Sequence, residues 1–440
     1  MISFIPEKFI NKNVRRYFMK KYISIILAVI IIISAVPSPA SAVATVKLGD
    51  VDCDNEVTSL DLALVKSHLL GIKALSGNPL IAADVNASQS VDALDLAELK
   101  QYLLNMITKF SGEVQQSSGV GITWMDGNKL YPVGVNYAWY NWSYEFSDNN
   151  WTSNFARIKS DMDTMATKGI HSLRWWIFPD LAYGPLWSGS GEGSLCTGLP
   201  SKWVDHMKET CDYALSKDIK IYWTITSFDC ARADDSVDHD DVIDNDTVRK
   251  SFLDNAMKPI LEALGNHEGV MGWDIINEPE WIVNGEDNGA PNGKGESFPL
   301  ADMRDYIKTT CEYIHQYAKQ PVSFGSANMK WLGAQFDLWD GLGLDFYDFH
   351  WYDWATPYFN PVTTPASSLK LDKPVIIGEM MPNTVGSSLK KSHKEVLDAI
   401  YKNGYAGYML WSWNDGAYDC KPYIGNDFIS FQSEHSDVVR

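Results

Sequence analysis

The sequence predicts an α/β protein in which a (β/α)8 TIM barrel is preceded by a small all-α domain. Short apolar segments alternate with helical segments from residue 119 to the C-terminus, which is typical of a parallel barrel. Before them, residues 50–70 and 84–104 are two copies of one loop-and-helix unit, offset by 34 residues. A chain of 440 residues with 45% hydrophobic residues is long enough for both domains.

Residues 1–44 are expected to be a secretory signal peptide. Two lysines precede an apolar stretch from Ile23 to Val36, and Ala40-Ser41-Ala42 offers a cleavage site. The apolar stretch of about 14 residues is short for a membrane span, and an uncleaved anchor is the alternative. Met19 directly precedes the lysines and is a possible true start. The mature protein is therefore expected to be secreted and extracellular, without a membrane segment.

Oxygen-bearing residues recur in the loop of each copy at positions 1, 3, 5, 9 and 12, and position 7 offers a backbone carbonyl. In the first loop they are Asp50, Asp52, Asp54, Thr58 and Asp61, with Glu56 at position 7; in the second they are Asp84, Asn86, Ser88, Asp92 and Asp95, with Ser90 at position 7. Alternating oxygen ligands in a twelve-residue loop that opens a helix are typical of calcium sites. The sequence therefore predicts two calcium-binding units, for which amphipathic helices with solvated acidic loops are the alternative.

On these residues, the segment from Lys47 to Ile107 resembles a type I dockerin, the module that binds cohesin domains of cellulosome scaffold proteins. The resemblance implies structural calcium, a cohesin partner and a cellulosomal location. In that family, loop positions 10 and 11 recognise the cohesin, which here are Ser59-Leu60 and Ala93-Leu94. Asn55 and Gln89 stand at position 6, where glycine is usual; asparagine tolerates the left-handed geometry, and glutamine does so poorly. Ser88 also replaces the usual aspartate at position 5 of the second loop. We therefore expect the second loop to bind calcium more weakly.

The expected organisation is a dockerin over residues 45–109, a polar linker over 110–118 and the barrel over 119–440. The formal charge of −19 argues against a nucleic-acid partner, because binding requires cations that neutralise phosphates. Six cysteines in a secreted chain permit disulfides, but they form no CxxC or metal-binding pattern and predict no particular bridge. Cys53, inside the first loop, is expected to be unpaired.

The barrel elements follow from apolar runs of strand length separated by longer amphipathic stretches. The eight expected strands are residues 131–136, 170–175, 219–226, 270–276, 321–325, 346–350, 375–379 and 406–411. The expected helices are residues 154–168, 202–217, 246–264, 300–319 and 389–403. Functional side chains in such a barrel lie at the carboxyl ends of the strands.

Two of these strands end in a glutamate. Residues 271–281 read MGWDIINEPEW, in which an apolar run ends at Glu278 and Pro279, and residues 374–380 read PVIIGEM, which contains Glu379. Pro279 disfavours helical geometry at Glu278, so the strand stops there. Strands four and seven lie roughly across a barrel, so the two carboxyls are expected to face each other. In a secreted chain with 17 Trp and 21 Tyr, this pair predicts glycoside hydrolysis, and a salt-bridged loop carboxylate is the alternative for either one.

At these residues the domain resembles glycoside hydrolase family 5, whose members are retaining enzymes on this barrel. The resemblance implies that Glu278 is the general acid/base and Glu379 the nucleophile. It also implies binding roles at the same mouth for Arg174, His350, Tyr352 and Trp411. The alternatives are a barrel-rim ion pair for Arg174, a hydrogen-bonded strand-end histidine for His350 and a core position for Trp411. The family often has a histidine after strand three, where this chain has Thr226-Ser227.

The expected surroundings of the two glutamates suit these roles. Arg174 and Tyr352 are expected to favour the ionised form of Glu379, and His350 is expected to relay the proton of the acid. Asn277 is placed to bind the 2-hydroxyl of the reacting sugar, and Asn136 follows the first strand at the same mouth. Tryptophans on expected loops are candidates for sugar subsites, namely Trp139, Trp142, Trp187, Trp281 and Trp354.

The sequence after the first strand, GVNYAWYNW, resembles the β-mannanases of this family, some of which carry N-terminal dockerins. We therefore expect a cellulosomal endo-β-1,4-mannanase without a cofactor in its catalytic site. An endo-β-1,4-glucanase is the first alternative, followed by enzymes acting on xyloglucan or mixed-linkage glucan. A catalytically inactive carbohydrate-binding protein is a further alternative, although both glutamates are present.

Overall fold

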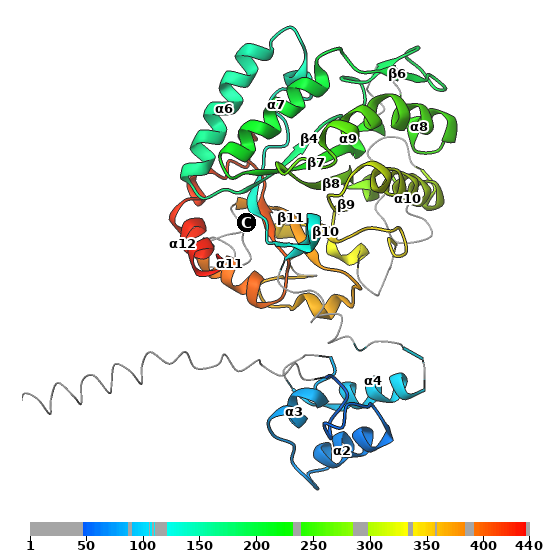
Figure 1. Cartoon of the computed structure of the whole chain (residues 1–440), viewed down its shortest axis with the longest axis vertical. Coiled ribbons are helices and arrows are strands. Elements are labelled where there is room, and N and C mark those ends of the chain that lie inside the picture. Colours follow the sequence, from blue (N-terminus) through cyan, green and yellow to red (C-terminus); the bar gives the residue numbers. More distant parts are fainter. Residues whose placement is uncertain are drawn as a thin grey trace, which may run out of the picture.

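The computed structural model describes residues 47–86, 90–104, 106–107, 110, 121–231, 239–284, 298–332, 338–356, 359–382 and 391–436. The N-terminal module and the barrel follow one another along the chain (Figure 1). The expected signal peptide, all of the expected linker after Phe110, and Ser88 lie outside the described residues. Among the helices of the described ranges, none is both long and apolar enough to cross a membrane.

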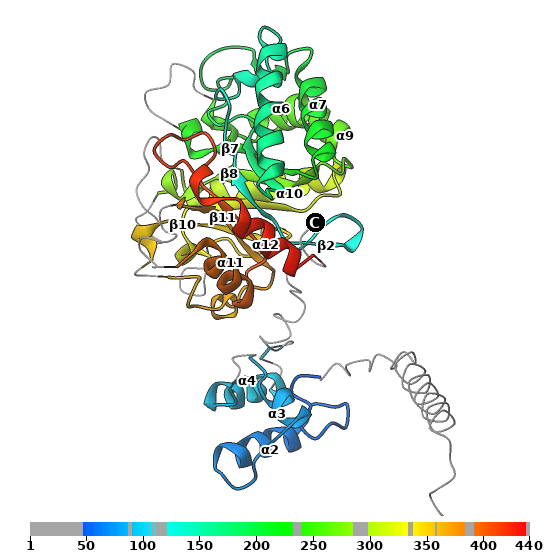
Figure 2. The ribbon, with the colours of Figure 1, turned by 90° about the vertical axis from the view of Figure 1, so that its left-hand side faces the viewer.

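The N-terminal module consists of helices α2 (Ser59–Leu69), α3 (Asn78–Ala83) and α4 (Ala93–Leu103), which Figure 2 shows side by side. α2 and α4 are the helices expected from the repeat, and each starts with a capping box, Thr58 with Asp61 and Asp92 with Asp95. Each buries one equivalent apolar residue, Val65 or Leu99. The short α3 was not predicted from the sequence.

Phe110 closes the core of this module. Its ring is fully buried and stacks on Tyr102 with 4.5 Å between ring centroids. The ring also lies against Gly49, where an added Cβ would come within 2.5 Å of a ring carbon and where φ is +81°. Glycine is therefore required at residue 49. Phe110 thus holds the first residues of the module in place.

The second unit is a closed barrel of eight parallel strands, so the predicted (β/α)8 fold is confirmed. Its strands are β3 (Val133–Asn136), β4 (Ser172–Trp176), β7 (Lys220–Ser227), β8 (Val270–Asn277), β9 (Val322–Ser326), β10 (Tyr347–Trp351), β11 (Val375–Met380) and β12 (Tyr408–Leu410). Each of the eight expected strands corresponds to one of these.

Helices lie on the outside of the barrel (Figure 1). They are α6 (Trp151–Thr167), α7 (Trp203–Ser216), α8 (Asp246–Phe252), α9 (Lys258–Leu264), α10 (Leu300–Tyr317), α11 (His393–Lys402) and α12 (Asn426–Glu434). The single helix expected over 246–264 is α8 and α9 joined by a π-helical turn, Leu253–Met257. α12 was not predicted; its Phe431 packs against Tyr131 and Tyr401.

Two short hairpins complete the barrel domain. β1 (Ile122–Thr123) pairs with β2 (Lys129–Leu130), and β5 (Leu186–Trp187) pairs with β6 (Cys196–Gly198). The first hairpin packs with residues near the beginnings of the strands, among them Tyr222, Met271 and Ile376. It therefore covers the amino end of the barrel and leaves the carboxyl ends of the strands for the polar residues described next.

Candidate active site

Glu278 directly follows β8 in a backbone conformation that is uncommon for a residue with a side chain. Its φ and ψ are 51° and 52°, in the left-handed region, and its N–H donates to the carbonyl of Gly325 at 2.7 Å. The chain then makes one 3-10 turn, η6 (Pro279–Trp281). Strained backbone of this kind collects at functional sites, because the surrounding structure has to hold it.

Glu379 lies within β11 and is almost completely buried. A guanidinium nitrogen of Arg174 donates to its Oε1 at 2.7 Å, and the hydroxyl of Tyr352 donates to its Oε2 at 2.5 Å. The expected neighbours of this carboxyl are therefore in contact with it.

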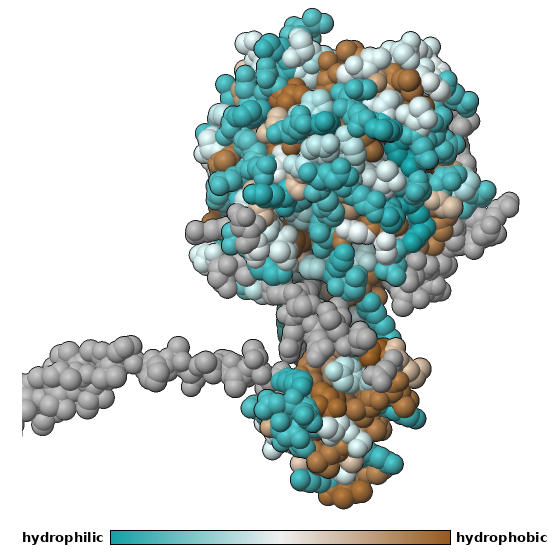
Figure 3. Space-filling model, turned by 45° about the vertical axis from the view of Figure 1, so that its right-hand side comes forward, coloured by the Kyte–Doolittle hydropathy of each residue, from teal (hydrophilic) through white to brown (hydrophobic). Residues whose placement is uncertain are grey.

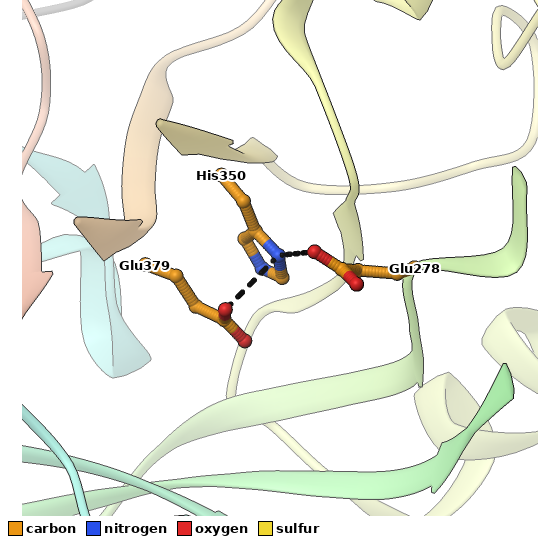
Figure 4. Close-up of side chains that lie close together, drawn as sticks. All are labelled: Glu278, His350 and Glu379. Carbon is orange, nitrogen blue, oxygen red and sulfur yellow. Dashed lines mark hydrogen bonds and ion pairs between the residues drawn. The ribbon is translucent and has the colours of Figure 1, made fainter. Parts of the chain in front are cut away.

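His350, at the end of β10, lies between the two glutamates (Figure 4). Its Nδ1 is 2.7 Å from Oε1 of Glu278 and 3.4 Å from Oε2 of Glu379. One oxygen of each carboxyl and a ring nitrogen of the histidine all lie within 4.8 Å of one another. The two carboxyls expected to face each other are thus adjacent.

Arg174, on β4, connects the residues at the carboxyl ends of the strands. It makes an ion pair with Asp274 at 2.7 Å and donates to the side-chain oxygens of Asn136 at 3.1 Å and Asn277 at 2.8 Å. The guanidinium is completely buried, so these partners and Glu379 replace the water that it loses. The alternative of a barrel-rim ion pair does not describe this position.

Burial sets the protonation states at this site. It raises the pKa of Glu379, and the charge of Glu278 acts in the same direction. His350, Arg174 and Tyr352 favour the ionised form, as expected for Arg174 and Tyr352, but burial outweighs them. Burial also lowers the pKa of His350 to about 4, which leaves the imidazole neutral at neutral pH. Burial and the carboxylates raise the pKa of Tyr352 well above 10, so the phenol keeps its proton and remains a donor.

An aromatic cluster borders these groups. Trp139 contacts Trp142, Trp176 and Trp411, with ring centroids 4.9, 5.0 and 5.7 Å apart, and Tyr352 packs against the cluster. The peptide bond after Trp411 is cis. Flat aromatic surface beside paired carboxylates suits a ligand that has both apolar C–H faces and hydroxyl groups, as a sugar does.

The remaining tryptophans expected at subsites lie in three different settings. The indole of Trp281 donates to Oε2 of Glu278 at 2.8 Å. Trp187 is partly buried, donates to the carbonyl of Leu181 and stacks on His239. Trp354 is 49% exposed on a turn after β10.

Several residues of this region were not singled out from the sequence. They are the carboxylates Asp274, Glu280 and Asp348 and the aromatic residue Trp176. Asp274 and Asp348 are single carboxylates within otherwise apolar strands, and that contrast is the signal that could have identified them. At the end of strand three, where family 5 often has histidine, the Ser227 hydroxyl accepts from Asn277 at 3.3 Å.

The first acidic loop of the N-terminal module fits a cation. Oxygens of Asp50, Asp52 and Asp54 lie within 4.8 Å of one another, which brings together like charges that a bound cation would offset. Burial and the repulsion of Asp61 raise the pKa of Asp52. Asn55 has a φ of +75°, the left-handed geometry expected at its position. The Asp61 carboxyl accepts from backbone N–H groups of the same loop.

The second loop has a similar frame. Asp95 accepts from the backbone of Asn86 and Asp92, and burial raises the pKa of its carboxyl. Within the described part of this loop, which lacks Ser88, the carboxylates do not form a compact group of three like that of the first loop. The six cysteines all lie in described ranges and are free, including exposed Cys53.

Residues 48–104 match the family model described as the dockerin type I domain. The barrel is similar over most of its length to known proteins. The mannan endo-1,4-beta-mannosidase of Mytilus edulis is 24% identical over 358 residues, which cover 73% of this chain and 93% of the relative. The enzyme of the same name from Cryptopygus antarcticus is also 24% identical and covers 74% of this chain and 90% of the relative.

Two solved structures share the fold. The endo-1,4-beta-mannanase of Eisenia fetida superposes with a TM-score of 0.60 at 24% identity, over 70% of this chain and 91% of that one. The beta-1,4-mannanase of Aplysia kurodai superposes with a TM-score of 0.62 at 23% identity, over 72% of this chain and 96% of that one. The prediction of an enzyme of the glycoside hydrolase class agrees with these relatives.

Proposed function

We propose that the barrel is an endo-β-1,4-mannanase of the family 5 type that hydrolyses mannan and glucomannan with retention of anomeric configuration. The observation that carries this proposal is the pair Glu278 and Glu379, joined through His350 and set beside Arg174. Retaining enzymes hold their two carboxyls about 5–5.5 Å apart, whereas inverting enzymes need about 6.5–9.5 Å for an intervening water. One oxygen of Glu278 and one of Glu379 lie within 4.8 Å of each other and approach the same nitrogen of His350, and this proximity supports the retaining class.

In the first step, Glu379 attacks the anomeric carbon and the glycosidic bond breaks, while Glu278 gives its proton to the departing oxygen. Arg174 and the Tyr352 hydroxyl hold the Glu379 carboxylate in place for this attack. In the second step, water attacks the glycosyl–enzyme ester and Glu278 takes up its proton, which frees Glu379. Neutral His350 lies close enough to both carboxyls to hold them at this spacing.

The substrate is proposed from the relatives and from the aromatic cluster. Both curated relatives are named for mannan hydrolysis. Trp139, Trp176 and Trp411 offer the aromatic surface that a polysaccharide chain needs beside the two glutamates. Asn277, whose side-chain oxygen accepts from Arg174, is the amide proposed for a sugar hydroxyl. The side chain of Asn136, the other amide expected at this mouth, is completely buried; its nitrogen donates to the carbonyls of Gly378 and Leu410 and its oxygen accepts from Arg174, so it supports Arg174 rather than the sugar.

Product analysis tests this proposal. The full chain is expected to release short oligosaccharides from the interior of galactomannan and glucomannan, and faster than from carboxymethylcellulose. NMR of the first product should show the β-anomer, and azide should restore turnover to Glu379→Ala as the α-glycosyl azide. Faster turnover of carboxymethylcellulose would indicate a glucanase instead, and the α-anomer as first product would refute the retaining mechanism.

We further propose that the N-terminal module binds calcium and docks onto a cohesin of an extracellular scaffold after secretion. The family match and the first loop, where Asp50, Asp52 and Asp54 would hold the ion, support this. Hydrophobic residues are prominent on the surface of this module (Figure 3). They include pairs related by the repeat, namely Leu60 and Leu94, Leu70 and Leu104, and Ile72 and Met106. Leu60 and Leu94 occupy the positions that the dockerin family uses for recognition.

A further inference from the structure

The chain folds back on itself directly after Glu278. The backbone N–H of Trp281 donates to the carbonyl of Glu278 at 3.1 Å, which closes the η6 turn. The side chain of Trp281 points back toward Glu278, and its indole Nε1–H donates to Oε2 of Glu278 at 2.8 Å. A residue three positions along the chain thus contacts the carboxyl to which we assign proton transfer.

The turn that carries Trp281 is fixed by its middle residue. Glu280 is completely buried and accepts from the Ser326 hydroxyl at 2.6 Å, the Ala327 N–H at 3.0 Å and the Trp339 indole at 2.8 Å. These donors lie on β9 and the segments that follow it, so Glu280 ties the turn to the next strand. Pro279 adds a fixed φ. The position of the Trp281 indole is therefore set by a rigid backbone.

Both oxygens of the Glu278 carboxyl are engaged by different neighbours. Oε2 accepts from Trp281, and Oε1 lies 2.7 Å from Nδ1 of His350. Because that nitrogen also faces the Glu379 carboxyl, the neutral imidazole keeps its hydrogen there and donates. Within the described ranges, the titratable and charged groups that face Glu278 include His350 on β10, Glu379 on β11 and Tyr352 after β10, with Arg174 on β4 behind Glu379.

We propose that Trp281 is a positioning residue for Glu278: its indole N–H fixes the plane of the carboxyl and helps to set the pH at which this group gives up its proton. The proposal rests on the role assigned to Glu278 under the proposed function. An indole is a donor only and has no basic atom that could compete for the proton. A donor to a carboxylate favours the ionised form, so its loss favours the protonated form. The indole also keeps the carboxyl from turning between the two steps of the reaction.

Replacement of the indole tests this role. In the full chain, Trp281→Phe is expected to move the alkaline limb of the kcat/KM profile on mannan upward by about one pH unit, because the ionised carboxylate loses a charge-assisted hydrogen bond. It should also lower kcat about tenfold through loss of orientation. Trp151→Phe is the matched control, because the Trp151 indole donates to Glu209 at 3.0 Å on the outside of the barrel. The control should leave the profile unchanged.

A second variant separates the N–H from the size of the ring. Benzothienylalanine at position 281 keeps a bicyclic ring and lacks the N–H, so it should reproduce the shift even if the phenylalanine variant folds poorly. A subsite role for the ring would raise KM without moving the alkaline limb. An alkaline limb that stays at the wild-type pH in both variants would therefore overturn the proposal.

A direct titration keeps this inference distinct from the proposed function. Carbon-13 NMR of glutamate carboxyls, with Glu278→Gln to assign the resonance, should show the Glu278 midpoint at higher pH in the variants than in the wild type. If the wild type does not hydrolyse mannan but the Glu278 midpoint shifts in the variants, the proposed function is wrong and the role of Trp281 stands. If the wild type hydrolyses mannan and the midpoint does not shift, only the role of Trp281 is wrong.

Discussion

Gly378, the residue before Glu379, is constrained by the side chain beside it. A Cβ at residue 378 would collide with both carboxyl oxygens of Asp348, which is buried on β10. Burial raises the pKa of Asp348 well above its usual range, although the Arg174 charge opposes this. The end of β11 can therefore approach β10 only because residue 378 has no side chain.

Gly378→Ala should destabilise the barrel by about 1–3 kcal/mol, because the added methyl overpacks a site that has no room. It should also lower kcat, because the displaced backbone carries Glu379. Thermal unfolding and mannan hydrolysis measure the two effects. Gly416→Ala is the matched control, since an added Cβ there meets nothing within 4 Å. Equal melting temperatures for the two variants would contradict the packing argument.

At this scale, the sequence identified residues that carry a local signal. Glu278 and Glu379 end apolar runs, and a proline marks the first of them, so their place at the strand ends could be predicted. The partners of Arg174 could not be predicted in the same way. Asp274 lies 100 positions from Arg174 along the chain, and only closure of the barrel brings the two together. The buried role of Glu280 could not be predicted either, because its partners Ser326 and Trp339 lie 46 and 59 positions along the chain.

Among the elements, long amphipathic helices and apolar strands were predictable, and short or interrupted ones were not. α3 and α12 have little periodic pattern and are held by packing rather than by propensity. The π-helical turn between α8 and α9 leaves no mark in a continuous amphipathic sequence. The repeat predicted α2 and α4 because each loop supplies its own capping box.

The start of α11 is expected to be sensitive to acid. Burial lowers the pKa of His393 to about 4, and its ring packs edge-on against Tyr423 and Phe428. A folded-state pKa below the ordinary value of about 6.5 contributes stability that is present above that pH and is lost as pH falls toward 4. His393→Phe keeps the ring contacts and removes the charge. It should recover up to about 3 kcal/mol of the stability lost over this range.

Denaturant unfolding at pH 7 and at pH 4 measures this effect. The variant should lose less stability than the wild type between the two pH values. Some loss should remain, because His350 is shifted in the same direction. An identical loss in variant and wild type would show that protonation of His393 does not destabilise α11.

The two calcium loops are expected to be unequal. Asp61→Ala removes a carboxylate that accepts from three backbone N–H groups of the first loop, in which Asp50, Asp52 and Asp54 also lie close together. Asp95→Ala changes the second loop, whose described part has no such cluster of three carboxylates. Calcium titration by calorimetry should therefore lose the tighter site in Asp61→Ala and the weaker site in Asp95→Ala. Mannan hydrolysis should be unchanged in both variants. Loss of the tighter site in Asp95→Ala would reverse the assignment.

For the whole molecule, the core of the N-terminal module and the core of the barrel are separate clusters of buried residues. The small module has few buried apolar residues to offset the repulsion of its acidic loops, so calcium is expected to supply much of its folding free energy. Calorimetry of the full chain should show two transitions, of which a chelator lowers only one. Hydrolysis should survive the chelator. A chelator that lowers both transitions, or stops hydrolysis, would contradict independent folding.

The whole architecture was accessible from the sequence because each unit has its own periodic signature, a duplicated loop in one and strand–helix alternation in the other. The distinction between mannan and glucan was not accessible in this way. It depends on how Trp139, Trp176 and Trp411 meet a sugar ring, and these three come from different βα loops or strand ends.

Phe110 has a mechanical consequence. If the module docks as proposed, tension between an anchored scaffold and an insoluble polysaccharide would enter the module at its C-terminal end, where Phe110 lies. Its ring packs between Gly49 and Tyr102 in the core of the module. A force on the chain would therefore have to remove this ring from the core before it could unfold α4. We therefore expect the buried ring to resist such a pull before the force reaches the calcium loops. Leucine at this position would leave the module's calcium affinity at rest nearly unchanged and would lower the force at which the module opens.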